Sequence, residues 1–209
     1  MNIISNNCAA GFLYKKYKAE YNNPFMWAFI DPKDYMYLIK NYNKINYKNY
    51  SIILLPKDLC KNNNSITKKI DVGCSILGIK IDNSISVYYT HYLENEMKDK
   101  IHEDAANVFV NDVEKYVIEK YTTRVERMNE KPIFFIIGYA HHNWNKELLE
   151  ELCNLENEKI ILITNETLTP KPNVKIIYDD MKELNASIMI DKHYDEIKSE
   201  IEKFYEKSL

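Results

Sequence analysis

The sequence predicts an α/β fold, a three-layer, Rossmann-like sandwich with helices on both faces of a mixed, mostly parallel central sheet. Two observations predict it. Short apolar runs typical of buried strands alternate along the chain with helical stretches that carry one apolar face. One pair of strands is joined by a tight turn at Asp82 and Asn83, which places an antiparallel hairpin within the otherwise parallel order.

The first half of the chain predicts short strands, two helices and a hairpin. Ile3 and Ile4 form a short strand, and Asn6 or Asn7 caps the helix that follows it. A second helix begins at Asp31, because an aspartate followed by a proline is a favoured helix start. Further strands are expected at residues 51–56 and on both sides of the hairpin turn within residues 72–92.

The second half predicts one long helix and four strands. The longest helical pattern runs over residues 104–128, with an apolar stripe along one face. Strands are expected at residues 134–139, 160–165, 174–178 and 188–190, with helices around Leu148 and Ile201. No repeat, low-complexity linker or change in composition divides the chain, so residues 1–209 are expected to form a single α/β domain.

The composition excludes several classes of protein. With 45% hydrophobic residues the chain can bury a core, and its formal charge of -3 gives no overall attraction to nucleic acid or anionic lipid. No apolar run approaches the roughly 20 residues of a transmembrane helix, and no signal-peptide core is present, so we expect a cytoplasmic protein. Four scattered cysteines indicate neither a zinc module nor a disulfide framework. Four glycines form no standard phosphate loop, so no cofactor is expected.

The polar turn after the first strand is the first candidate site. In open α/β sheets, ligands bind at the carboxyl ends of strands, and helix N–H groups there attract anions. Ser5, Asn6 and Asn7 are therefore candidate substrate-binding residues, and the two asparagines serve equally well as helix caps. Cys8 is a candidate nucleophile, because a helix N-terminus stabilises a thiolate. The alternative is a buried structural cysteine.

Histidines add two candidate catalytic residues. His91 follows a strand and is a candidate general base. His141 follows the central strand, whereas His142 points to the other face because successive side chains of an extended segment alternate. No HxxxH or HxH spacing supports a metal site made by Cys8, His91 and His141, so no metal is expected.

A pair of arginines on the long helix provides positive charge. Arg124 and Arg127 lie one helical turn apart, which suits two-point binding of a phosphate or carboxylate. The alternative is surface ion pairing, because Glu126 and Glu119 are close in the sequence. We therefore keep both arginines as candidate substrate-binding residues.

Three stretches share their order and spacing with a known family. They are residues 4–11 with the Ser5-Asn6-Asn7-Cys8 motif, followed by residues 21–24 and 31–35; the segment from Val72 to Tyr92; and residues 121–127. Together they resemble a bacterial family of exopolysaccharide-biosynthesis proteins, from whose pattern this chain departs at Ala9, Ala10, Tyr121 and Thr123. The resemblance implies a cytoplasmic α/β domain with a part in polysaccharide production, and it implies no catalytic mechanism.

Two functional hypotheses follow. The first is a transferase of exopolysaccharide or capsule biosynthesis that acts on an activated sugar, acyl or phosphoryl donor. It places Asn6, Asn7, Cys8, His91, His141 and Arg124 around one crevice. The second is a non-catalytic domain that binds a saccharide, or a partner enzyme of polysaccharide assembly, through an aromatic surface. A cysteine hydrolase is disfavoured, because no nucleophile-elbow motif surrounds Cys8.

Overall fold

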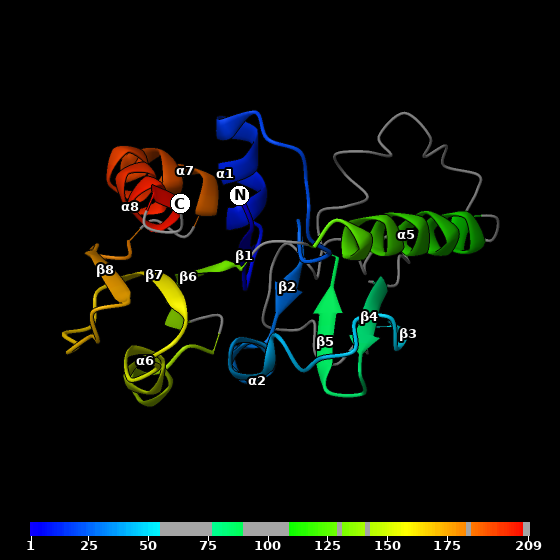
Figure 1. The fold of residues 1–209 in the computed structure, drawn as a ribbon, viewed down its shortest axis with the longest axis horizontal. Coiled ribbons are helices and arrows are strands. Elements are labelled where there is room, and N and C mark those ends of the chain that lie inside the picture. Colours follow the sequence, from blue (N-terminus) through cyan, green and yellow to red (C-terminus); the bar gives the residue numbers. More distant parts are fainter. Residues whose placement is uncertain (55–76, 90–108, 129–130, 141–142, 183–184, 207–209) are drawn as a thin grey trace.

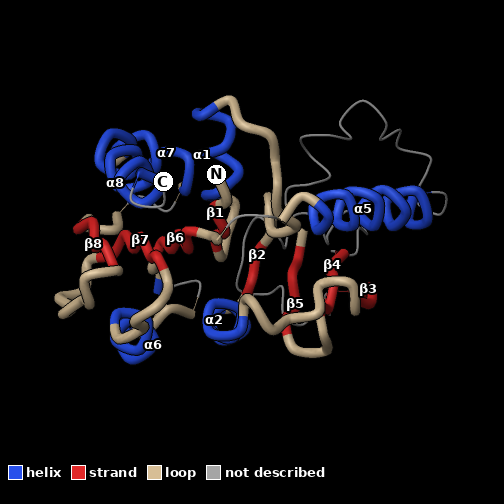
Figure 2. The backbone as a smooth tube through the Cα atoms, viewed as in Figure 1, coloured by secondary structure: helices blue, strands red, loops and turns tan. Residues whose placement is uncertain are grey.

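The computed structural model describes residues 1–54, 77–89, 109–128, 131–140, 143–182 and 185–206. These residues form two four-stranded sheets and six helices, so the α/β class is confirmed (Figures 1 and 2). No helix in this part of the chain is both long enough and apolar enough to cross a lipid bilayer.

The first sheet is entirely parallel, and its order is β1-β6-β7-β8. Its strands are β1 (Ile3–Ser5), β6 (Ile133–Ile137), β7 (Lys159–Thr164) and β8 (Val174–Tyr178). All five residues of β6 are buried, as expected for a central strand that is covered on both faces. In the register, Ile4 pairs with Phe134 and Phe134 pairs with Ile160.

The second sheet is antiparallel, and its order is β2-β5-β4-β3. Its strands are β2 (Phe29–Ile30), β3 (Tyr50–Leu54), β4 (Leu77–Ile81) and β5 (Ile85–Tyr88). β4 and β5 form the predicted hairpin. Asp82 and Asn83 at its turn have φ angles of 49° and 56°, the left-handed conformation that a two-residue hairpin turn requires.

The prediction of one mixed sheet is wrong for the described residues, because the antiparallel strands pair only with one another. The two sheets lie side by side, with β2 beside the end of β1 (Figure 1). A backbone hydrogen bond of 3.0 Å from Ile30 N to Asn6 O joins them there. Hydrophobic periodicity predicts where strands lie but not which strands pair with one another. The Rossmann-like sandwich stays a prediction.

Helices lie on both sides of the parallel sheet, and one further helix lies beside the antiparallel sheet. Figure 1 shows α1 (Ala9–Tyr17), α7 (Ala186–Lys192) and α8 (Tyr194–Glu206) on one side, and α2 (Pro32–Asn41) and α6 (Lys146–Cys153) on the other. The long helix α5 (Phe109–Glu126) lies on the side of the antiparallel sheet. It accounts for most of the 104–128 range that we expected, and residues 104–108 lie outside the described part.

The strand predicted at residues 188–190 is wrong, because these residues belong to α7. Asn185 caps this helix by accepting a hydrogen bond of 2.9 Å from Ser187 N. Ala186, Met189 and Ile190 are buried while Ile188 is 50% exposed, which is a helical spacing. A three-residue apolar run is too short for its periodicity to separate the two structures.

The start of α2 confirms the predicted cap, and one tyrosine fixes this helix to the sheet. Asp31 Oδ1 accepts a hydrogen bond of 3.0 Å from Lys33 N, and Pro32 is the first helical residue. Tyr35 is fully buried and donates a hydrogen bond of 2.6 Å from its hydroxyl to Ile4 O. Its ring packs edge-on against Trp144, so α2, β1 and the segment after β6 share one core.

Candidate functional site

The predicted site residues do not all come together. Ser5, Asn6, Asn7 and Cys8 lie between β1 and α1, at the carboxyl end of the parallel sheet. Arg124 and Arg127 lie at the end of α5, in a groove that contains none of those four residues. His91, His141 and His142 fall outside the described residues, as do Cys60 and Cys74.

Ser5 and Asn7 cap α1. Asn7 Oδ1 accepts a hydrogen bond of 2.9 Å from Ala9 N, and Ser5 Oγ accepts one of 2.9 Å from Ala10 N. The Ser5 hydroxyl donates in turn to Asn7 O. Two N–H groups of the first helical turn are thus already paired within the chain, which reduces what this helix end can offer to an anion.

Cys8 is the N-cap residue of α1 and is partly buried. Burial raises the pKa of the Cys8 thiol to about 11, which outweighs the lowering effect of a backbone hydrogen bond. The thiol is therefore protonated at neutral pH, and this favours the structural reading of Cys8 over the nucleophilic one.

Iodoacetamide is expected to alkylate Cys8 at least about 10-fold more slowly at pH 8 than it alkylates an exposed cysteine, because little thiolate is present. Mass spectrometry of the peptide that contains Cys8, over a range of pH, measures this rate. We expect the rate to go on rising above the ordinary thiol pKa of 9.0. A rate that levels off below that pH would instead indicate an activated thiolate.

A hollow of about 490 Å³ lies beside the segment that follows β6. It is lined by the start of α2, from Asp31 to Lys33, and by the segment that leads into α6, including Asn143 and Trp144. Asn145 Oδ1 caps α6 by accepting a hydrogen bond of 2.9 Å from Leu148 N. The first turns of two helices thus border this hollow.

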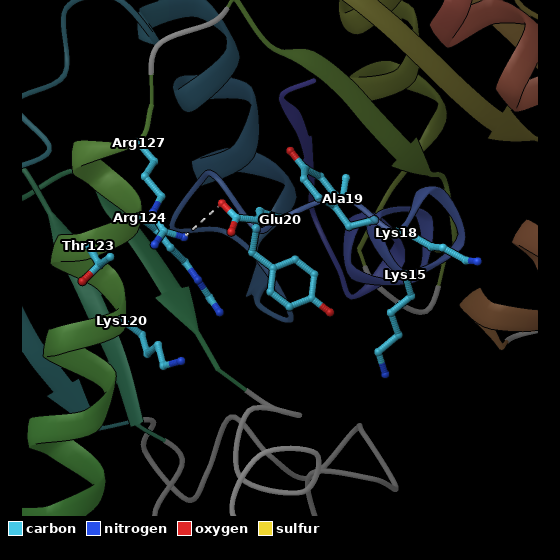
Figure 3. A pocket seen from close by; sticks show the side chains of 10 residues that line it. Lys15, Lys18, Ala19, Glu20, Lys120, Thr123, Arg124 and Arg127 are labelled. Carbon is cyan, nitrogen blue, oxygen red and sulfur yellow. Dashed lines mark ion pairs between the residues drawn. The ribbon is translucent and has the colours of Figure 1, made fainter.

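A groove of about 520 Å³ between α1 and α5 is lined by several basic side chains, and we call it the basic groove. Figure 3 shows the basic side chains of α5 on one side and those of α1 on the other, with Glu20 between them. Its lining residues are Tyr14, Lys15, Lys18, Ala19, Glu20, Tyr21, Lys120, Thr123, Arg124 and Arg127. Five of these are basic and one is acidic.

Helical spacing explains how α5 supplies four of these residues. Thr123, Arg124 and Arg127 lie three, four and seven residues after Lys120, so the four side chains share one face. On the other side, Lys18 ends α1 in the left-handed conformation, with φ of 51°, and turns the chain toward Tyr21. The sequence spacing of Arg124 and Arg127 placed these two residues together on one side of the groove. It did not predict the residues of α1, because only the fold brings α1 beside α5.

Aromatic rings hold two of the cations in place. The guanidinium carbon of Arg124 lies 5.2 Å from the centre of the Tyr21 ring, and this side chain is only 5% exposed. Lys15 Nζ lies 4.6 Å from the centre of the Trp27 ring. An aromatic face stabilises a cation without cancelling its charge.

Among the described residues that line the basic groove, Glu20 is the acidic one. Glu20 Oε2 lies 3.9 Å from Arg127 Nη1, and both side chains are well exposed, so this ion pair is weak. The carboxyl ends of α1 and α5 each add about half a negative charge from their peptide dipoles. Among the described residues that line the groove, five cations outnumber one carboxylate, and this balance favours an anion.

A smaller hollow of about 280 Å³ lies on the opposite face of α5, and Tyr47, Tyr50 and Tyr121 line part of it. The Tyr121 hydroxyl donates a hydrogen bond of 2.8 Å to Tyr47 O, and the ring centres of Tyr50 and Tyr121 are 4.8 Å apart. Tyr121 is therefore packed into the core, whereas Tyr50 is only partly buried.

Comparison with known proteins adds a family to this geometry. Residues 1–179 match a family described as Domain of unknown function (DUF1919). The chain belongs to this family. The DUF1919 match takes in both sheets, the basic groove and the polar turn before α1, and it ends where β8 ends, so α7 and α8 lie beyond it. No curated protein matches the chain.

Proposed function

We propose that this protein binds a phosphate-bearing activated donor in the basic groove and takes part in exopolysaccharide or capsule biosynthesis, as a transferase. The observation that supports the proposal is the charge of the groove, five cations against one carboxylate. Activated sugar donors, acyl-CoAs and phosphoryl donors all carry phosphate, the group that arginine and lysine bind best. The polysaccharide pathway comes from the family resemblance of the Ser5-Asn6-Asn7-Cys8 motif and its companion stretches.

The groove suits a phosphate in its geometry as well as its charge. Arg124 is buried and lies against Tyr21, so little side-chain freedom is lost when its guanidinium binds an anion. Lys18 and Arg127 are exposed and able to follow a flexible ligand. A volume of about 520 Å³ falls in the range of small-molecule sites.

The second candidate function is a non-catalytic domain that binds a saccharide or a partner enzyme. Cys8 favours this function, because the residue does not line the basic groove and its thiol is protonated at neutral pH. The partly buried Tyr50 beside Tyr121 supplies an aromatic surface for this reading. Turnover of a donor that the groove binds would decide in favour of the transferase.

Charge reversal in the groove is expected to weaken donor binding by about 10- to 100-fold, the effect of losing one or two charge-assisted hydrogen bonds. The variants are Lys18→Glu and Arg127→Glu, whose side chains are exposed, so folding should be preserved. Isothermal titration with nucleotide sugars, acyl-CoAs and polyprenyl-phosphate analogues measures the affinity. Binding to the wild type should also weaken as salt is raised.

Two matched variants control this experiment. Lys44→Glu makes the same change of charge at an exposed lysine outside the described hollows, and it should leave affinity unchanged. Glu20→Gln removes the groove's carboxylate and should tighten binding. Donor affinity that is equal in the wild type, Lys18→Glu and Arg127→Glu would refute the groove as the donor site. Cellular polysaccharide levels in the same variants test the pathway.

A further inference from the structure

Asn6 is an anomaly in the core. Its side chain is 0% exposed, yet neither Oδ1 nor Nδ2 has a hydrogen-bonding partner within the described chain. Asn7 Nδ2 is also buried without a partner there, although Asn7 Oδ1 caps α1. A buried amide without partners destabilises a fold, so such a group calls for an explanation.

Asn23 is as deeply buried as Asn6, but its side-chain amide is hydrogen-bonded within the fold. It is also 0% exposed, and its Nδ2 donates to Asn2 Oδ1 at 3.0 Å and to Ile3 O at 2.9 Å. Its Oδ1 accepts a hydrogen bond of 3.1 Å from Phe25 N. The fold therefore can satisfy a buried amide beside β1, and it leaves the amide of Asn6 for another partner.

The unpaired atoms indicate the chemistry of that partner. Asn6 offers an acceptor and a donor side by side, and Asn7 offers a second donor. A phosphate or carboxylate supplies only acceptors, and it would leave Asn6 Oδ1 unpaired. The first-turn N–H groups of Ala9 and Ala10, which would otherwise favour an anion, are already bonded to Asn7 and Ser5. A hydroxyl group both donates and accepts, and two neighbouring hydroxyls match the whole amide.

We propose that the side-chain amides of Asn6 and Asn7 form a subsite for two neighbouring hydroxyl groups of a neutral saccharide. The subsite lies at the carboxyl end of β1, where ligands of α/β sheets bind. Asn6 O is held by Ile30 N, and Asn7 Oδ1 by Ala9 N, so both residues are fixed before the sugar arrives. The next residue, Cys8, is only partly buried, and Asn7 is 5% exposed.

This subsite is separate from the basic groove. The groove is lined from Tyr14 to Tyr21 and by α5, whereas Asn6 and Asn7 precede the other end of α1. A nine-residue helix is about 13 Å long, so one sugar ring does not reach both places. The saccharide subsite can therefore be tested independently of donor binding in the basic groove.

The test uses glucose, galactose, mannose and N-acetylglucosamine as probes of the full chain. We expect at least one of them to raise the melting temperature and to move the side-chain amide signals of Asn6 and Asn7 in nitrogen-15 NMR spectra. Monodeoxy forms of that sugar should bind about 10-fold more weakly when one of the two recognised hydroxyls is missing.

Two variants complete the test. Asn6→Leu keeps the shape of the side chain, and it should abolish the sugar response without lowering the melting temperature of the free protein. Asn7→Asp keeps the oxygen that caps α1 and removes the donor, so it should weaken sugar binding while the fold is preserved. Lys44→Glu, at an exposed lysine outside the described hollows, should leave the sugar response unchanged. The proposal is overturned if no probe moves the amide signals, or if Asn6→Leu responds as the wild type does.

Discussion

Replacing Asn23 by leucine is expected to lower the free energy of unfolding by about 4 kcal/mol. The change removes three buried hydrogen bonds, to Asn2 Oδ1, to Ile3 O and from Phe25 N. Each partner left unpaired in the core costs about 1–3 kcal/mol, and the gain from a more apolar side chain offsets only part of this. Urea unfolding followed by circular dichroism gives the difference.

Asn6→Leu is the matched control for this experiment. Asn6 and Asn23 are equally buried, but the Asn6 amide has no partner among the described residues, so its loss leaves nothing newly unpaired. We expect the two variants to differ by at least about 3 kcal/mol in the free energy of unfolding. Equal destabilisation by the two substitutions would contradict this account of Asn23.

Replacing Asp179 by asparagine is expected to lower the free energy of unfolding by about 2 kcal/mol at neutral pH. The Asp179 side chain is fully buried and accepts hydrogen bonds from Lys192 Nζ at 2.5 Å and from His193 Nε2 at 2.6 Å. Met181 N donates a third bond of 2.8 Å. The carboxylate thus fixes the end of β8 to the end of α7, and an amide in either orientation would turn its NH2 group toward at least one of these donors.

The same contacts predict an acid-dependent loss of stability. Burial alone would raise the pKa of Asp179, but the hydrogen bonds from Lys192, His193 and Met181 lower it from 3.8 to about 2. Because the folded-state pKa is the lower one, the stabilisation is complete above the unfolded-state value and is lost as pH falls from about 4 to about 2. About 1–2 kcal/mol is involved, since the half-exposed Lys192 is screened by solvent.

Urea unfolding of the wild type and Asp179→Asn across this pH range measures the effect. The stability difference between them should shrink as pH falls, while the other carboxylates affect both proteins alike. Carboxyl carbon NMR of Asp179 provides an independent midpoint. A difference that stays constant down to pH 2 would show that the charge of Asp179 does not stabilise the fold.

Local patterns predicted most of the elements, and the misses have physical causes. Asp82 and Asn83 predicted the hairpin because few residues accept the backbone angles of its turn. Asp31 predicted the start of α2 because capping is a local interaction. Pairing between β1 and β6 depends on residues far apart in the chain, and periodicity carries no information on it. The single mixed sheet was for this reason the wrong choice.

The candidate site was predictable only where it lies on one element. The spacing of Arg124 and Arg127 identified one wall of the basic groove, whereas Lys15 and Lys18 join it through the packing of α1. Asparagines pose a harder problem. Asn6 and Asn23 cannot be told apart in the sequence. Only the structure shows that the Asn23 amide is hydrogen-bonded within the fold, whereas the Asn6 amide has no partner among the described residues.

The pairing of β1 with β6 also sets an order of events during synthesis. All four strands of the antiparallel sheet lie between residues 29 and 88, so the ribosome completes them well before it reaches β6 at Ile133. Contacts this distant along a chain form late, because closing a long loop carries a large entropic cost. While translation continues, Ile3 and Ile4 have no strand to pair with. For that interval this short apolar segment is exposed to chaperones and to the sheet edges of other nascent chains.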